Sequence, residues 1–340
     1  MNLKDLFAEY YKRAKFYINN IFQREFAIGF NEKIEKRHLA FFTEEELRSF
    51  LIKEVPFYIS HSLAYYEKPS AEMKEKGFIK ADMAFDLDIK TPGIEALNKL
   101  KEEVAILIDM LKEDFGAKDL LIAFSGHRGF HVYVRDEVFQ ALKSEERKAI
   151  VEYITGRGFD YTLLFHEEGS KIIGPKPTEN GYRGRFARKT IEMLNDKHFS
   201  KHFGKTNEEI EAFKEGIING LWSKTKKRNI IKNLKLISDL ITIKESHLDL
   251  PVSYDLTRLM RLVNSLHGST GFIVLPIKSI DKFSIEKAYA FSDENVKVKI
   301  LFDIAKEDLV DLKDLKKDEI KLLPLYTAVY LVCQKKAVFV

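Results

Sequence analysis

The feature that most constrains this chain is a run of nine residues from Ala81 to Ile89, with the sequence Ala-Asp-Met-Ala-Phe-Asp-Leu-Asp-Ile. In a β-strand, successive side chains point to opposite faces of the sheet. One face of this strand would carry only apolar side chains, namely Ala81, Met83, Phe85, Leu87 and Ile89. The other face would carry Asp82, Ala84, Asp86 and Asp88. The pattern therefore predicts a strand with one face in a core and one acidic face.

The acidic face needs something to neutralise it. Asp is depleted in strands, and the carboxylates of Asp86 and Asp88, two positions apart, repel one another. A divalent cation with hard oxygen ligands relieves this repulsion, and Mg²⁺ or Mn²⁺ suits a pair of Asp oxygens together with substrate phosphates. The alternative is a solvated sheet edge whose aspartates have no function. The spacing alone leaves both interpretations open, because Asp-x-Asp is common in acidic sequences.

The composition is that of a globular protein. The chain has 340 residues, 45% of them hydrophobic, which is enough for two or three domains or for one large domain with an insertion. Its net charge of +4 neither requires nor excludes nucleic acid. Its one cysteine, Cys333, excludes an intrachain disulfide. With no signal-peptide pattern and no apolar run of membrane-spanning length, we expect a cytoplasmic protein that does not contact a membrane.

Strand and helix patterns divide the chain into a core and an insertion. Both patterns run through residues 1–156 and return over 249–340, whereas residues 157–248 are rich in Lys and mainly helical in their later half. Near the end, the strand-like run 326–333 is followed by a Gln-Lys-Lys turn and by 337–340, which predicts a closing hairpin. We therefore expect an α/β (α+β) fold with a mixed sheet, made of 1–156 and 249–340, and a helical insertion over 157–248.

A second motif, Ser-Gly-His-Arg-Gly-Phe-His, occupies residues 125–131 between two apolar runs. Its two glycines let the backbone approach a ligand closely, and Ser125, Arg128 and His131 can donate hydrogen bonds to phosphate oxygens. The alternative is a hairpin turn with incidental charge. Short loops that contain Gly are frequent, so this motif by itself does not establish a phosphate site.

A third motif runs from Asp255 to Gly271. It supplies another carboxylate, two arginines that would share a helical face, Arg258 and Arg261, and His267 before a glycine-bounded turn. In the alternative, Asp255 caps a helix and the arginines form its solvated side. Three carboxylates from two places, combined with two sets of phosphate donors, match the needs of metal-assisted nucleotidyl transfer.

Four motifs in this order resemble those of the catalytic small subunit of archaeal and eukaryotic DNA primase. They are Tyr65-Tyr66-Glu67-Lys68-Pro69, Phe85-Asp86-Leu87-Asp88, Ser125-Gly126-x-Arg128-Gly129-Phe130-His131 and Asp255-x-x-Arg258-Leu-x-Arg261-x-x-Asn264-Ser265-Leu-His267-Gly268. The similarity extends from Arg24-Glu25-Phe26 to the final hairpin and is weak only in the insertion. An ordered set of motifs is more specific than any one of them.

The resemblance implies roles for individual residues. Asp86, Asp88 and Asp255 would hold two Mg²⁺ or Mn²⁺ ions that activate a primer 3′-hydroxyl and stabilise the leaving pyrophosphate. The triphosphate of the incoming nucleotide would be bound by Ser125, Arg128, His131, Arg261 and His267. For the two histidines, the sequence leaves open whether they are charged or donate through a neutral N–H.

The resemblance also implies an activity and a set of partners. We expect DNA-dependent RNA primer synthesis on single-stranded DNA for replication, from nucleoside triphosphates, by the catalytic subunit of a heterodimer with a large primase subunit. One feature departs from the family. Its members commonly carry a Cys/His zinc module soon after the paired aspartates, whereas here Lys90 leads directly into a predicted helix, and with one cysteine in the chain we expect no zinc site.

Three alternatives stay open from the sequence. A stand-alone primase-polymerase of the same superfamily would act in repair or plasmid replication, and a non-catalytic subunit would keep the fold and bind only nucleic acid. A metal-dependent phosphodiesterase would also use clustered aspartates, but it would not need two triphosphate-donor sets. Of two basic clusters, we favour template contact for residues 183–189 and leave residues 224–228 undecided between template contact and a solvated helix.

Overall fold

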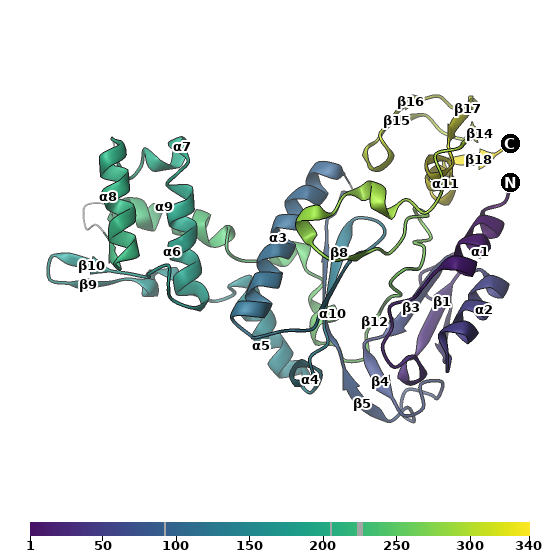
Figure 1. The fold of residues 1–340 in the computed structure, drawn as a ribbon, viewed down its shortest axis with the longest axis horizontal. Helices are drawn as coiled ribbons and strands as arrows, with labels where there is room; N and C mark the ends of the chain where they lie inside the picture. Colours follow the sequence, from purple (N-terminus) through teal and green to yellow (C-terminus); the bar gives the residue numbers. More distant parts are fainter. Residues whose placement is uncertain (92, 205, 223–226) are drawn as a thin grey trace. The chain divides into compact units, whose positions relative to one another are not determined.

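The computed structural model of the protein describes residues 1–91, 93–204, 206–222 and 227–340 (Figure 1). The chain forms two compact units. The core unit contains residues 1–104, 119–148 and 247–340, and the insert unit contains residues 105–118 and 149–246. Residues 149–246 of the insert unit overlap most of the predicted insertion, 157–248, and residues 105–118 come from earlier in the chain. No helix among the described residues is long and apolar enough to cross a membrane.

The first sheet of the core unit is antiparallel, with the strand order β12-β3-β1-β2. Its strands are β1 (Phe26–Gly29), β2 (Lys36–Leu39), β3 (Tyr58–Ser62) and β12 (Leu259–Arg261). Helices α1 (Leu3–Arg13) and α2 (Glu44–Glu54) lie beside β1 and β3 in Figure 1. Phe7 of α1 and Leu47 of α2 are fully buried in one cluster with Phe26 and Ile59 of the sheet, so the two helices and the sheet share a core.

Strand β12 corrects one expectation from the sequence. The segment with Arg258 and Arg261 was predicted to be helical, but residues 259–261 pair with β3, with Arg261 opposite Ser60. A strand of three residues is too short to show a period, so local sequence could not identify it. The two arginines therefore do not share a helical face.

The second sheet of the core unit contains the acidic strand, in the order β13-β7-β8-β6. Its strands are β6 (Met83–Asp88), β7 (Leu120–Phe124), β8 (Gly129–Val134) and β13 (Pro276–Ile277). The predicted strand is confirmed, and Met83, Phe85 and Leu87 are fully buried. The predicted acidic face is only partly solvated, because Asp82 is 2% exposed and Ala84 packs in a second core cluster with Leu63 and Met260.

A smaller sheet of three antiparallel strands lies near the end of the chain, in the order β17-β14-β18. Its strands are β14 (Asn295–Ile300), β17 (Ile320–Pro324) and β18 (Ala337–Phe339). Residues 325–333 form helix α11 (Leu325–Cys333), so the predicted closing hairpin is wrong. A short apolar run fits a buried helix as well as a strand. Here the run is a helix that buries successive residues, among them Ala328, Val329 and Leu331.

The remaining elements of the core unit connect these sheets. They are the strand pairs β4 (Ala64–Tyr66) with β5 (Phe78–Ala81) and β15 (Ile304–Glu307) with β16 (Leu312–Leu315), helices α4 (Glu137–Gln140) and α10 (Leu250–Tyr254), and 3₁₀ helices η1 (Ile21–Gln23), η5 (Ile280–Lys282), η6 (Ile285–Ala288) and η7 (Asp308–Val310). The 3₁₀ helix η4 (Glu245–His247) begins in the insert unit and ends in the core unit. Helices α3 (Ile94–Glu113) and α5 (Ser144–Thr155) begin in the core unit and end in the insert unit.

The insert unit is mainly helical around an aromatic core. Its elements are η2 (Tyr161–Leu164), β9 (His166–Glu168), β10 (Lys171–Ile173), α6 (Gly181–Met193), α7 (Lys197–Ser200), α8 (Asn207–Ile218), β11 (Leu221–Trp222) and α9 (Lys227–Asp239). Trp222, 2% exposed, contacts Phe165, Phe186 and Phe213.

The structure changes the interpretation of the first basic cluster, residues 183–189. Arg185 is buried and forms ion pairs with Asp109 and Asp114, and Arg188 forms one with Glu113. Arg183 pairs with Glu179, so most of this charge is neutralised within the insert unit. The cluster therefore offers a template less positive charge than its sequence suggests. The second cluster, at 224–228, lies outside the residues whose side chains the structure describes.

Candidate active site

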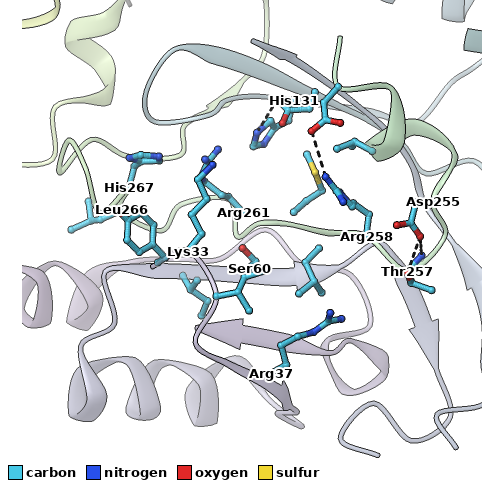
Figure 2. A pocket seen from close by; sticks show the side chains of 18 residues that line it. Lys33, Arg37, Ser60, His131, Asp255, Thr257, Arg258, Arg261, Leu266 and His267 are labelled. Carbon is cyan, nitrogen blue, oxygen red and sulfur yellow. Dashed lines mark hydrogen bonds and ion pairs between the residues drawn. The ribbon is translucent and has the colours of Figure 1, made fainter. Parts of the chain in front are cut away.

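A cavity of about 350 Å³ in the core unit is lined by residues of both four-stranded sheets (Figure 2). Its polar lining residues are Lys33, Arg37, Tyr58, Ser60, Asp86, His131, Asp249, Asp255, Thr257, Arg258, Arg261 and His267. Five of the residues predicted from the sequence are therefore brought to one cavity, although they come from positions 86 to 267 of the chain. Asp88, Ser125 and Arg128 do not line the cavity and belong to the strand end and loop beside it.

The carboxylates of the acidic strand lie where β6 pairs with β8. Asp86 is directly opposite His131, and Asp88 is opposite Gly129. The distance from His131 Nε2 to Asp86 Oδ1 is 3.6 Å, which is longer than a hydrogen bond. Asp88 Oδ2 accepts a hydrogen bond of 2.7 Å from Arg128 Nε, whereas Asp88 Oδ1 is buried without a partner among the described residues. The protein thus leaves carboxylate oxygens of both aspartates unused.

Burial, together with the negative charges of Asp88 and Asp249, raises the pKa of Asp86 to about 6, while Arg261 and Lys33 oppose the shift. Asp249 is beside Asp86 because its backbone N–H donates a 2.9 Å hydrogen bond to the Asp86 carbonyl oxygen. Two carboxylates, that of Asp88 beside the cavity and that of Asp249 in its wall, therefore act on Asp86. A bound divalent cation would stabilise their ionised forms.

Asp255 lies elsewhere on the cavity wall. Its Oδ1 accepts hydrogen bonds from the backbone N–H of Thr257 at 2.9 Å and from the Thr257 hydroxyl at 2.8 Å. Figure 2 shows Asp255 turned toward Thr257, at the end of the cavity away from His267. The carboxylate that the structure places beside Asp86 is Asp249, which the sequence analysis did not single out. Asp249 follows the insertion directly, and no local pattern marks it.

Two histidines of the cavity are neutral donors. Burial lowers the pKa of His131 and of His267 well below the usual value, and the positive charge of Arg261 lowers both further. His267 Nδ1 accepts a 3.2 Å hydrogen bond from the N–H of Ser269, so in the neutral ring the proton is on Nε2. The Nε2 atoms of both rings are buried without partners in the described part of the chain. A ligand oxygen would satisfy them.

The loop of residues 125–129 is held against the segment that carries His267. Ser125 Oγ accepts a 3.1 Å hydrogen bond from the N–H of Gly129, and the Gly126 carbonyl accepts one of 2.6 Å from the hydroxyl of Thr270. Gly126 has φ of +82°, and a Cβ there would lie 2.7 Å from Cβ of His267. Only glycine allows the two segments to approach so closely. The loop thereby fixes the position of His267 as well as of its own side chains.

Carboxylates, neutral N–H donors and the positive charges of Arg261 and Lys33 line this one cavity, and these are the groups that a metal-bound triphosphate requires. A cavity of this kind defines a nucleotidyltransferase. Comparison with known proteins agrees with this class. The family model of the DNA primase small subunit matches residues 85–279.

Named relatives match almost the whole chain. The DNA primase small subunit PriS of Methanococcoides burtonii is 32% identical over 98% of this chain and 97% of that protein, and the one of Archaeoglobus fulgidus is 33% identical over the same shares. The PriS of Pyrobaculum islandicum is 30% identical over 98% of both chains. Among solved structures, the polymerase domain of Mycobacterium tuberculosis ligase D in complex with DNA covers 82% of each chain at 12% identity and a TM-score of 0.40.

The chain belongs to the DNA primase small subunit family. It is accordingly a nucleotidyltransferase, the catalytic small subunit of an archaeo-eukaryotic primase, which makes RNA primers and depends on divalent metal ions. The predicted family, fold class and enzyme class are confirmed. The roles of individual residues, the identity of the metal and the large subunit stay predictions.

Proposed function

We propose that this chain makes RNA primers on single-stranded DNA, for replication in the cytoplasm, in the cavity of Figure 2. The observation that carries the proposal is that Asp88, beside the cavity, and Asp249, in its wall, both act on Asp86, whose pKa is raised to about 6 by burial and by these acidic neighbours. A protein that used these carboxylates only for stability would neutralise them with its own donors. Here Asp86 has no ion pair shorter than 3.6 Å and Asp88 Oδ1 has no partner among the described residues, so both aspartates keep oxygens for a cation and a substrate.

The donor set fits Mg²⁺ or Mn²⁺, because both ions prefer carboxylate oxygens together with phosphate and water. Asp88 Oδ1 has no partner among the described residues, and Gly129 keeps the space beside it open, since a Cβ there would lie 2.9 Å from that oxygen. No three His, Cys, Asp or Glu side chains of the described residues are grouped closely enough to hold a metal ion as they stand. The aspartates would therefore turn their oxygens toward the ion. When bound, the ions would lower the pKa of the primer 3′-hydroxyl and stabilise the leaving pyrophosphate.

Asp249 is the better candidate for the third ligand. It is tied to Asp86 through the backbone, and its charge raises the pKa of Asp86. Asp255, the residue predicted from the sequence, uses its Oδ1 to accept both hydrogen bonds from Thr257, and no hydrogen bond among the described residues ties it to Asp86. Arg258 Nη2 lies 3.5 Å from Asp249 Oδ2 and would help to orient Asp249.

The triphosphate would lie in the same cavity, where His131 of β8 is beside Asp86 of β6. His131 and His267 would donate from their neutral rings, and Arg261 and Lys33 would supply the positive charge. Arg128 already pairs with Asp88, so it would connect the phosphate site to the metal site. The hydroxyl of Ser125 accepts from Gly129 and would support the loop.

The family's small subunits are named as one part of an enzyme, and we propose a large primase subunit as the partner of this chain. The test is primer synthesis on single-stranded DNA with labelled nucleoside triphosphates and Mg²⁺ or Mn²⁺, with and without that subunit. Asp86→Asn should lower the rate at least about 1,000-fold, since it would remove a carboxylate that would hold the metal ions. The control is Asp119→Asn, which removes an exposed carboxylate outside the cavity.

Each result has a separate meaning. Synthesis that needs the second subunit supports the replicative primase, and synthesis by the chain alone favours a stand-alone primase-polymerase. A wild-type chain that binds template and makes no product under any of these conditions contradicts the catalytic role of the cavity. Equal rates for Asp86→Asn and Asp119→Asn would mean that the metal site does not include Asp86.

A further inference from the structure

The sheet of β14, β17 and β18 in the core unit has an unusual outer face. Antiparallel strands that face solvent on one side normally alternate apolar and polar residues. The inner side follows this rule, because Val298, Ile300 and Ala337 are buried. The outer side carries four exposed aliphatic residues, namely Ile320, Leu322, Val338 and Val340, with exposed fractions of 58%, 60%, 43% and 66%.

The strand register arranges these residues in two rows. Lys299 is paired with Ile320 on one side and with Val338 on the other, so the first row reads aliphatic, lysine, aliphatic. Lys297 is paired with Leu322, and its carbonyl accepts a hydrogen bond from the N–H of Val340, so the second row repeats the pattern. Residues paired across strands share a face, so all six side chains lie together on what we call the C-terminal face.

The lysines at the centre of the face decide what can cover it. Lys299 Nζ lies 2.9 Å from Asp318, whereas Lys297 forms no ion pair with any described residue. A second copy of the chain, packed face to face, would bring the central lysines of both copies together and desolvate like charges, which is strongly unfavourable. A partner with apolar side chains around a carboxylate would match both rows. The charge pattern therefore favours a different protein over a second copy.

The size of the face also limits its role. Three strands spaced by about 4.8 Å and two rows spaced by about 6.7 Å give the C-terminal face an area of roughly 200 Å². This area is a quarter of the surface of about 800 Å² that each partner buries in a stable interface. Binding energy is concentrated in small apolar patches at the centre of an interface. The C-terminal face has the size of such a central patch and not of a complete interface.

We infer that the C-terminal face is the centre of the docking site for the large primase subunit, which would contribute an apolar surface with an acidic side chain for Lys297. This inference rests on the heterodimer put forward above and adds the surface that forms it. Exposed apolar patches ringed by polar residues are typical of protein interfaces. The lysine stems would pack with the aliphatic residues while their charged ends reach the carboxylates.

The test is the dissociation constant between the full chain and the purified large primase subunit of the same genome. Leu322→Lys places a charge in the apolar row and should weaken binding at least about tenfold. Lys297→Glu reverses the central charge and should weaken binding about fivefold or more. The matched control is Val138→Lys on α4, which is as accessible at 76% exposure and should change binding less than about twofold. Extension of a preformed primer by the chain alone should be unchanged in all three variants.

The outcomes separate the two proposals. A wild-type chain that does not bind the large subunit contradicts the heterodimer, and the docking face with it. Binding that Leu322→Lys and Lys297→Glu leave within twofold of wild type, or that Val138→Lys weakens equally, contradicts the docking face alone. Self-association of the wild-type chain that Leu322→Lys abolishes would overturn the inference in favour of a second copy. If Leu322→Lys fails to fold in a thermal melt, Lys297→Glu, an exposed charge reversal, decides the question.

Discussion

Asp82 and Asp86 are four positions apart in one extended segment, yet they differ in how many hydrogen-bond donors surround their carboxylates. Asp82 is 2% exposed and accepts hydrogen bonds from Arg24 Nη2 at 2.5 Å, from Gln140 Nε2 at 2.7 Å and from the Tyr65 hydroxyl at 3.1 Å. For Asp86 the nearest basic nitrogen in an ion pair among the described residues is His131 Nε2, at 3.6 Å. One carboxylate is fully neutralised by the protein, and the other is not.

The difference distinguishes a structural charge from a functional one. A buried ion pair in which both carboxylate oxygens accept hydrogen bonds holds segments of the chain together. Around Asp82 these segments are the one before β1, which carries Arg24, and the elements β4 and α4. A partly buried carboxylate that lacks donors and faces like charges destabilises the fold unless a ligand arrives. The same residue type in one extended segment is therefore neutralised by the protein at Asp82 and left without donors at Asp86, and the surrounding residues decide which.

The largest expected effect is on stability, from Asp82→Asn. This change leaves Arg24, which is 1% exposed, without its counter-charge, and it should lower the free energy of unfolding by about 3 to 4 kcal/mol. Urea denaturation measures the loss. Asp119→Asn is the control, because its pair with Arg135 is half exposed and should cost less than about 1 kcal/mol. Losses of equal size would erase the proposed difference between the two kinds of carboxylate.

A smaller effect, on activity, tests which third carboxylate belongs with Asp86. Asp249→Asn should lower the rate of primer synthesis about 100-fold, since it removes one metal ligand. Asp255→Asn should lower it less than about fivefold, because that side chain holds a turn through Thr257. Rates at several Mn²⁺ concentrations measure both variants. The reverse order of the two effects would restore Asp255 as the ligand.

The smallest effect concerns the stability of the metal-free chain. The pKa of Asp86 is raised from 3.8 to about 6, so between these values the folded chain binds more protons than the unfolded chain, and stability falls as pH rises. Above pH 6 the ionised carboxylate costs at most about 3 kcal/mol. In EDTA at pH 7.5, Asp86→Asn should therefore be about 1 to 3 kcal/mol more stable than wild type.

Two further readings check this last prediction. The advantage of Asp86→Asn should shrink as the pH is lowered toward 4, because the wild-type carboxylate is then protonated as well. Added Mg²⁺ should raise the melting temperature of wild type and leave that of the variant almost unchanged. A variant that is less stable than wild type at pH 7.5 would mean that Asp86, like Asp82, is a structural charge.

Much of the candidate site was predictable because its signals are local. The alternation from Ala81 to Ile89 predicted β6 and its buried face, and the glycines of residues 125–131 predicted the turn that β7 and β8 enclose. Ordered motifs identified the family. The prediction failed where a segment was too short to show a period, as in β12, or where an apolar run suited two structures, as in α11.

The sequence by itself determined the acidic strand and the glycine-containing turn between β7 and β8, because each depends on residues within about ten positions of one another, and the order of the motifs along the chain determined the family. Only the tertiary structure decided which carboxylates act together. Asp249 reaches Asp86 through a backbone hydrogen bond between segments 163 positions apart, and Arg24 reaches Asp82 across 58. No sequence pattern within one segment predicts these contacts, since they depend on how separate segments pack. Whether the protein neutralises an aspartate therefore depends on residues that are distant in the sequence.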